Sequence, residues 1–201
     1  MADAAQVKTG YIRGMRGALI TVLKKDGSKD PAGEVHWVDP TQAAKVEGVI
    51  DEGESDSVRG GDGILGTLTE ESKLTGATVT LTNARFDAKL TTIVAGGKLI
   101  TDTEVTTEIV GWDAPMSDED SGARLTFMVE LFASNFTSSG RKDGYIKVTV
   151  PYCSGNIASV DYGDQNWATE EFKFNGAEND TLQIPTTRKE FVKDLPAEAT
   201  A

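Results

Sequence analysis

The stretch LTFMVELF, residues 125–132, decides the fold. Every second side chain from Leu125 to Leu131 is apolar, which is the period of a β-strand with one face in a core. The same alternation occurs in ATVTLT, residues 77–82, and in IKVTV, residues 146–150. Weaker strand candidates bounded by turn residues follow at 18–23, 35–38, 105–112, 157–162, 168–174 and 182–184. Many short strands predict a mainly β fold, built as a sandwich or a barrel.

One helix is expected among the strands, at about residues 86–96. Apolar residues recur there at helical spacing, namely Phe86, Leu90, Ile93 and Val94. Asp87 can cap the N-terminus of this helix, and Gly96 with Gly97 can end it in a backbone conformation that favours glycine. The apolar stripe is expected to lie across an open end or face of the sandwich.

Composition limits the function classes. A chain of 201 residues fits one domain, residues 1–201, and its 38% hydrophobic and 26% charged residues exclude a membrane-spanning or wholly disordered protein. The net charge of −12 has the wrong sign for tight binding of nucleic acid. The first apolar run, 18–23, is followed at once by Lys24 and Lys25, so neither a signal peptide nor a membrane span is expected there. Folding in a reducing cytoplasm is expected.

Little in the chain predicts catalysis. One histidine, His36, and one cysteine, Cys153, leave no material for disulfide frameworks or His/Cys zinc sites. His36 is expected to face away from the core, and Cys153 to be a buried hydrophobe. The G-x-G-x-x-G at 61–66 follows an acidic run rather than a βα unit, and the acidic run 118–120 lacks the glycine and glutamate of an EF-hand. We therefore expect no enzyme, no catalytic residues, no cofactor and no metal.

Two acidic segments hold the whole net charge. Residues 45–75 contain three basic and eight acidic residues, and residues 101–122 contain seven acidic and no basic residues. Glycine and serine interrupt the first segment and its periodicity is weak, so residues 44–73 are predicted to form a long acidic, mobile loop. The Ala-, Glu- and Pro-containing C-terminus, about 193–201, is predicted to be an arm.

Residues 77–175 resemble the tail tube (major tail) proteins of long-tailed bacteriophages and prophages, especially those of Gram-positive hosts. The resemblance depends on the order and spacing of four features: VTLTNARFDAKL at 79–90 followed by Gly96-Gly97, GWDAP at 111–115, the alternating strand at 125–132, and VPYCSG at 150–155 followed by the aromatic-rich run 167–174.

The resemblance implies a β-sandwich with one flanking helix, whose copies form rings, typically of six, that stack into a tube through long loops and terminal arms. Such a protein is made in the host bacterial cytoplasm and ends in the tail of the virion. The implied partners are further copies of the chain and the tape-measure, tail-terminator and baseplate or distal tail proteins. DNA passes through the tube without tight binding, and no membrane is involved.

Three residue sets follow from this hypothesis. Contacts between rings are expected from the acidic loop, with candidates Val46, Ile50, Asp51, Glu52, Glu54, Asp56 and Arg59. Negative charge facing the lumen, which would repel DNA weakly and evenly, is expected from Glu104, Glu108, Asp113, Asp118, Glu119 and Asp120. Basic partners for the acidic loop of a neighbouring copy are expected among Lys8, Arg13, Arg16, Lys24 and Lys25.

A carbohydrate-binding or adhesin-like β-sandwich of a phage or bacterial surface is the alternative. Such a module usually presents exposed aromatic side chains in a groove. The three tryptophans, Trp37, Trp112 and Trp167, each lie within a predicted strand or turn that can bury them.

Overall fold

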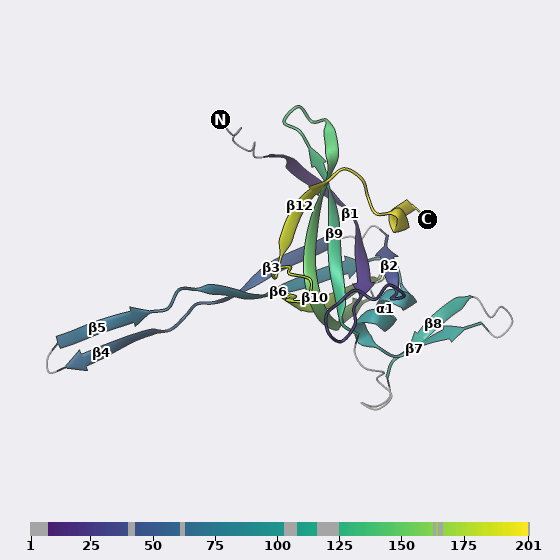
Figure 1. Cartoon of the computed structure of the whole chain (residues 1–201). Helices are drawn as coiled ribbons and strands as arrows, with labels where there is room; N and C mark the ends of the chain where they lie inside the picture. The colour runs from purple at the N-terminus through teal and green to yellow at the C-terminus, as the bar shows by residue number, and fades with distance from the viewer. Residues whose placement is uncertain are drawn as a thin grey trace.

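Antiparallel strands dominate the computed structural model of the chain (Figure 1). The structure describes residues 8–39, 43–60, 63–102, 108–115, 125–162, 164 and 167–200. Its elements are, in chain order, β1 Tyr11–Val22, β2 Val35–Val38, β3 Ala43–Asp51, β4 Ser55–Gly60, β5 Gly63–Thr69, β6 Lys73–Asn83, α1 Ala88–Ala95, β7 Lys98–Thr101, β8 Ile109–Asp113, β9 Phe127–Phe136, β10 Lys142–Asp161, β11 Thr169–Ala177, β12 Arg188–Val192 and the 3-10 helix η1 Ala197–Thr200.

The main sheet has eight strands, in the order β2-β1-β9-β10-β11-β6-β3, with β12 also paired to β10. All of its pairings are antiparallel. Figure 1 shows β3 and β6 crossing behind β1, β9 and β10, so the sheet folds over on itself into two layers. The prediction of a mainly β fold with one flanking helix is confirmed.

Strand β10 forms the corner between the two layers. Its first part pairs on one side with β12, up to Thr149 opposite Arg188, and its second part pairs on that side with β11 from Tyr152 onward, while the ladder with β9 continues to Cys153. Buried Pro151 lies at this change of partner. Proline has no backbone N–H to donate to a ladder, so it suits a place where one ladder ends and another begins. The two sequence candidates at 146–150 and 157–162 are therefore halves of one long strand.

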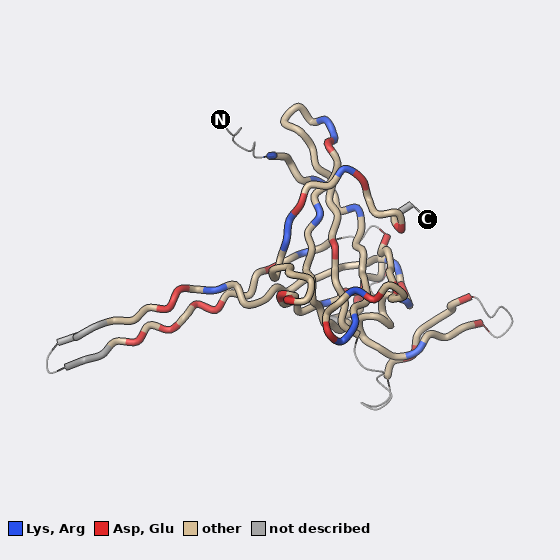
Figure 2. Tube along the Cα trace, viewed as in Figure 1, with Lys and Arg blue, Asp and Glu red and all other residues tan. Residues whose placement is uncertain are grey.

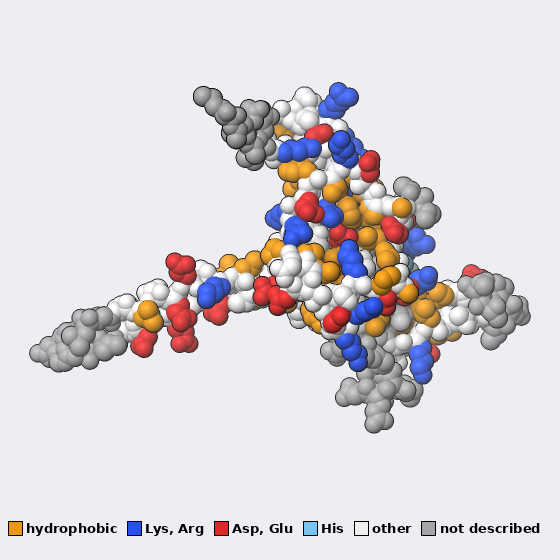
Figure 3. All heavy atoms as spheres, viewed as in Figure 1, with side chains coloured by type: hydrophobic (Ala, Val, Ile, Leu, Met, Phe, Trp, Pro, Cys, Tyr) orange, Lys and Arg blue, Asp and Glu red, His pale blue; other side chains and the backbone are white. Residues whose placement is uncertain are grey.

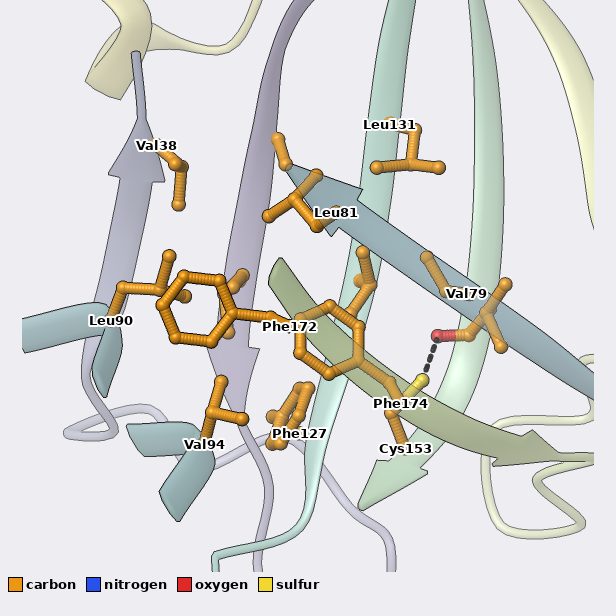
Figure 4. Packing of buried hydrophobic residues seen from close by; sticks show 14 of the residues in the cluster. Val38, Val79, Leu81, Leu90, Val94, Phe127, Leu131, Cys153, Phe172 and Phe174 are labelled. Atoms are coloured by element: carbon orange, nitrogen blue, oxygen red, sulfur yellow. Dashed lines mark hydrogen bonds between the residues drawn. The ribbon is translucent and has the colours of Figure 1, made fainter. Parts of the chain in front are cut away.

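The core lies between the layers (Figure 4). Phe127 of β9 and Phe174 of β11 meet edge to face, with ring centroids 5.3 Å apart. Phe172 lies beside them and is fully buried, as is Cys153, whose Sγ contacts the Val150 carbonyl oxygen at 3.6 Å. The alternating apolar residues of β6 and β9 belong to the same cluster, together with residues of β1, β2 and β10, namely Ala18, Ile20, Val38, Ala77, Val79, Leu81, Val129, Leu131 and Val150. The burial of Cys153 confirms its interpretation as a buried hydrophobe.

Helix α1 closes one end of this core, as its apolar spacing predicts. Leu90, Ile93 and Val94 are buried against the sheet. Asp87 is the N-cap, and its Oδ1 accepts a hydrogen bond from the backbone N–H of Leu90 at 3.0 Å. Gly96 ends the helix with a φ of 77°, a conformation that L side chains rarely adopt. Phe86 departs from the prediction, because it precedes the cap and is 54% exposed.

The prediction of a long loop at 44–73 is wrong, because most of the described residues in this range belong to paired strands. Strand β3 pairs with β6, and β4 pairs with β5 in the same hairpin. The exposure of β3 and β6 alternates close to the core, but their outer residues, 48–51 and 73–75, are exposed on both faces. Figure 1 shows β4 and β5 extending far from the two layers. We call β4, β5 and the outer ends of β3 and β6 the arm.

Two further predictions are corrected near the C-terminus. Residues 182–184 are not a strand, because only an isolated bridge between Asn179 and Ile184 closes a turn there. Strand β12, which was not predicted, follows at Arg188–Val192. The C-terminal segment, which was predicted to be an arm at about 193–201, lies against its own chain, because its 3-10 helix η1 contacts β2.

Candidate assembly surfaces

Three strands of the main sheet offer an open edge. Within the described residues, β2, β3 and β12 each have a ladder partner on one side only, namely β1, β6 and β10. Strand β3, with nine residues, is the longest of the three. An edge of this kind carries backbone N–H and C=O groups that can pair with another chain. These edges are therefore places where identical copies could join.

The arm combines acidic charge with exposed apolar side chains. Asp51, Glu52, Glu54 and Asp56 are all exposed, and Figure 2 shows the acidic residues along both strands of the arm. Figure 3 shows apolar side chains gathered at its base. Its large apolar side chains and their exposed fractions are Val49 47%, Ile50 60%, Leu68 70% and Leu74 50%. A projection that exposes so much apolar surface is typical of a segment that contacts a partner.

The candidates for contacts between rings fall into two groups. Ile50 and the four carboxylates are exposed on the arm, where a neighbour can reach them. Val46 is not available in this way, because it packs against the core opposite Val79 of β6. Arg59 lies on β4. The part of β3 that a neighbouring copy can contact therefore begins beyond Gly48, on the side away from the core.

Most of the candidates for lumen charge cannot be placed. Glu104, Asp118, Glu119 and Asp120 lie outside the described residues. Glu108 and Asp113 are exposed at the start and end of the β8 segment of a small hairpin, in which β7 pairs with β8. Which charges face a lumen stays a prediction.

Three of the basic candidates have contacts within their own chain. Lys8 Nζ lies 3.0 Å from Asp143 Oδ2, and Arg16 Nε donates to Ser134 Oγ at 2.7 Å. Lys24 Nζ lies 4.0 Å from Asp30 Oδ1. Arg13 and Lys25 are exposed. Exposed ion pairs are weak, so these contacts do not test the prediction that the basic residues meet a neighbouring copy.

His36 and Asp87 form a polar contact that sequence reasoning missed. His36 Nε2 lies 2.7 Å from Asp87 Oδ2, which ties β2 to the N-terminus of α1. Burial alone would raise the pKa of the Asp87 carboxyl, but its hydrogen bonds with His36 and the Leu90 N–H hold that pKa below its usual value. His36 is half-buried and does not simply face solvent as expected. The pair joins residues that are far apart in sequence, so no local pattern signals it.

A cavity of about 840 Å³ lies beside this pair, between β2, the residues around the start of α1, and η1. His36, Asp87, Arg85 and Glu198 are among its lining residues. The described lining residues include no serine, threonine or cysteine. The His36–Asp87 contact connects β2 to the N-terminus of α1 along one side of this cavity.

Glu170 of β11 carries an electrostatic cost. Its Oε2 is buried and has no hydrogen-bond partner among the described residues. Burial and the nearby negative charge of Asp87 raise the pKa of the Glu170 carboxyl.

Lys147 of β10, in contrast, is held between two carboxylates on neighbouring strands, with Nζ 3.1 Å from Glu130 and 3.0 Å from Glu190. These charges tie β9, β10 and β12 together.

Metal and membrane features were searched among the described residues. No group of three or more His, Cys, Asp or Glu side chains there is arranged to hold a metal ion. No helix in that part of the chain is long and apolar enough to cross a bilayer.

Comparisons with known proteins leave the family open. No family model and no curated protein matches the chain. Among solved structures, the chain is similar to a chain of the cryo-EM structure of the anti-feeding prophage (AFP) baseplate, 6-fold symmetrised, with 9% sequence identity and a TM-score of 0.33 over 94% of this chain and 99% of that chain. A TM-score this low carries no argument about function. Membership of the tail tube family therefore stays a hypothesis.

Proposed function

We propose that this chain is the structural subunit of a phage tail tube. Copies join at their open strand edges into rings of six, and the arm of each copy reaches an adjacent ring. The tube encloses the tape-measure protein during assembly and later conducts DNA. The observation that carries the proposal is the arm, a long paired hairpin that exposes Val49, Ile50, Leu68 and Leu74 far from the core.

The open edges supply a reason for ring formation. A long edge such as β3 invites pairing with any other strand, and closed folds avoid this hazard by leaving no edge. Pairing β3 of one copy with another edge of the next copy uses two different surfaces, which is a head-to-tail contact. Such contacts close into a ring when the rotation between copies is right. The assembly then satisfies backbone groups that one copy alone leaves open.

The charge of the chain suits a conduit for DNA better than a DNA-binding protein. A net charge of −12 repels phosphates, whereas clustered Lys and Arg side chains would hold them. The role is structural, without catalysis, cofactor or metal. In this proposal, the contact between His36 and Asp87 holds α1 in its position beside β2.

Electron microscopy of concentrated protein tests the proposal. The wild-type chain is expected to form hollow tubes of constant diameter. The informative variant replaces residues 55–69, which contain β4 and β5, by Asn-Gly between Glu54 and Glu70. The Glu70 N–H already donates to the Glu54 carbonyl at 3.1 Å, so a two-residue turn can close the shortened hairpin there. Removing only one of the two strands would leave its partner unpaired.

The shortened variant is expected to keep its circular dichroism spectrum and to form rings without stacking. A matched control replaces an exposed apolar residue elsewhere, Val110→Ser on β8, which is 55% exposed. This control is expected to form tubes. Normal tubes from the shortened variant would contradict the role given to the arm.

The carbohydrate-binding alternative now has one observation in its favour. Trp167 is 88% exposed and not buried as the sequence suggested, whereas Trp37 and Trp112 are half-buried. Trp112 Nε1 donates to the Gly96 carbonyl oxygen at 2.7 Å, so its polar edge is used within the fold. Saturable glycan binding by a chain that stays monomeric at high concentration would favour this alternative over the tube.

A further inference from the structure

We propose that the loop between β10 and β11 of one copy docks into an apolar depression at the opposite end of β10 in a second copy. This contact would join copies within the assembly proposed above, and its biological meaning rests on that proposed function. It identifies a specific contact between copies that is separate from the arm and from the strand edges.

The donor surface consists of the described residues on either side of the connection from β10 to β11. Its two large aromatic side chains, Tyr162 and Trp167, are 82% and 88% exposed. Val160, at the end of β10, is a further apolar residue with 37% exposure. Aromatic side chains lose much water-accessible area on binding and are enriched among the residues that dominate interface energy. Two exposed aromatic side chains between the end of β10 and the start of β11 are typical of an anchor that enters a partner.

The acceptor surface lies where β1 begins and the β9–β10 hairpin turns. A depression of about 370 Å³ is lined there by Tyr11, Arg13, Phe136, Thr137, Ser138 and Gly140. Tyr11 and Phe136 are directly opposite each other in the β1–β9 ladder, and Tyr11 is 67% exposed. Depressions of about 300 Å³ and more are large enough for small ligands, so a single aromatic side chain can enter this one.

The acceptor is preorganised by its own turn. The Thr137 N–H donates to the Arg141 carbonyl at 2.8 Å, and the Gly140 N–H donates to the Thr137 carbonyl at 2.9 Å. Gly140 has a φ of 76°, which suits glycine at this position of the turn. A wall that is already ordered loses little conformational entropy when a side chain enters it.

The charges of the two surfaces are complementary. Asp161 and Asp164 are exposed on the donor turn. Arg13, Arg141 and Lys142 are exposed around the acceptor, and Figure 2 shows the basic residues on the β9–β10 hairpin. Asp143 is the acidic residue of that hairpin, and it is paired with Lys8 at 3.0 Å. Opposite charges on the rims favour this pairing over donor-to-donor contacts.

The topology makes the contact intermolecular. The β9–β10 turn and the β10–β11 turn lie at opposite ends of β10, a strand of 20 residues. Its first nine residues alone span roughly 30 Å at the usual rise per residue. A turn at one end that enters a depression at the other end therefore belongs to another copy. Such a contact joins different surfaces of the two copies, so it propagates from copy to copy.

Site-directed disulfide cross-linking tests the docking. One variant carries Ser138→Cys in the acceptor, and another carries Ala168→Cys beside Trp167 in the donor. The native thiol does not compete, because Cys153 is fully buried and burial raises its pKa to about 12. A mixture of the two variants is expected to give a disulfide-linked dimer containing one copy of each, while each variant alone gives none. A mixture of Ser138→Cys with Lys89→Cys, an exposed position on α1, is the control and is expected to give none.

Two further changes test which forces act. Adding Trp167→Ala to the donor variant is expected to lower the cross-linking yield at limiting concentration by about tenfold or more, whereas adding Leu68→Ala on the arm is expected to leave it unchanged. Charge reversal of the donor, Asp161→Lys with Asp164→Lys, is expected to lower the yield. The reversed acceptor, Arg13→Glu with Arg141→Glu, is expected to restore it.

The outcomes separate this inference from the proposed function. Tubes that form without the mixed cross-link would overturn the docking and leave the tube proposal standing. The mixed cross-link in the absence of tubes would support the docking and contradict the tube. A cross-link of Ala168→Cys with itself would show donor-to-donor contact and would overturn the inference, as would a yield that Trp167→Ala does not change.

Discussion

Replacing Asp87 by alanine removes two contacts at once and is expected to destabilise the chain measurably. The Oδ1 atom caps α1 through the Leu90 N–H at 3.0 Å, and the Oδ2 atom lies 2.7 Å from His36 Nε2. Because α1 closes the core, loss of its cap weakens the packing of Leu90 and Val94 as well as the helix itself.

The magnitude follows from the two contacts. Loss of an N-cap costs about 0.5–2 kcal/mol of unfolding free energy. A hydrogen bond to a charged group contributes about 1.5–3 kcal/mol, and the 18% and 20% exposure of the His36 and Asp87 side chains places this one at the low end of that range. We expect Asp87→Ala to lower the unfolding free energy by about 2–3 kcal/mol near neutral pH. Asp87→Asn keeps a capping oxygen and is expected to lose about half as much.

The effect has a defined pH dependence. The pKa of Asp87 is lower in the folded chain than its ordinary value of 3.8, so the folded state favours the carboxylate. The stabilisation is fully present above the unfolded pKa and is lost as the pH falls through the lower folded pKa. The difference in unfolding free energy between wild type and Asp87→Ala is therefore expected to shrink as the pH falls below the ordinary pKa of 3.8.

Urea unfolding followed by tryptophan fluorescence measures this difference. The protein must be dilute enough to remain monomeric, because assembly would raise the apparent stability. Asp56→Ala on the arm is the control, and its exposed side chain predicts a change below about 0.5 kcal/mol. An Asp87→Ala chain as stable as this control, or a loss that is equal at pH 3 and pH 7, would refute the reasoning.

Three further predictions concern the core and its edge. Glu170→Gln is expected to raise the unfolding free energy at pH 7 by less than about 1 kcal/mol, because burial raises the pKa of Glu170 and its ionised form costs stability, while the partial exposure of the side chain lets solvent screen that cost. The gain should vanish in acid, and Glu171→Gln is the control. Phe172→Ala, which empties a fully buried site, is expected to cost about 3–5 kcal/mol in urea unfolding. The Cys153 thiol is expected to resist iodoacetamide at pH 8 and to react once urea unfolds the chain; labelling of the native protein would contradict its burial.

The sequence alone determined the parts of the fold whose local pattern matches their burial. The alternation at 77–82 identified β6, because one face of this strand lies in the core. The alternation at 125–131 also identified β9, although Met128 and Phe132 on its other face are buried and Leu125 before it is 39% exposed. The Asp87 cap, the spacing of Leu90, Ile93 and Val94, and Gly96 identified α1 in the same way. In these segments the period of the apolar residues equals the period of the element.

Only the tertiary structure decided the features on which the proposed function depends. The arm has both faces exposed along its outer residues, so its strands carry no alternation between apolar and polar residues, and their glycines indicate a loop. The pairing of His36 with Asp87 and the opposite placement of the two turns of β10 join residues that are distant in sequence. Backbone hydrogen bonds between strands and the path of the chain determine these features. Every residue type has the same backbone groups, so the local sequence does not show which distant segments pair.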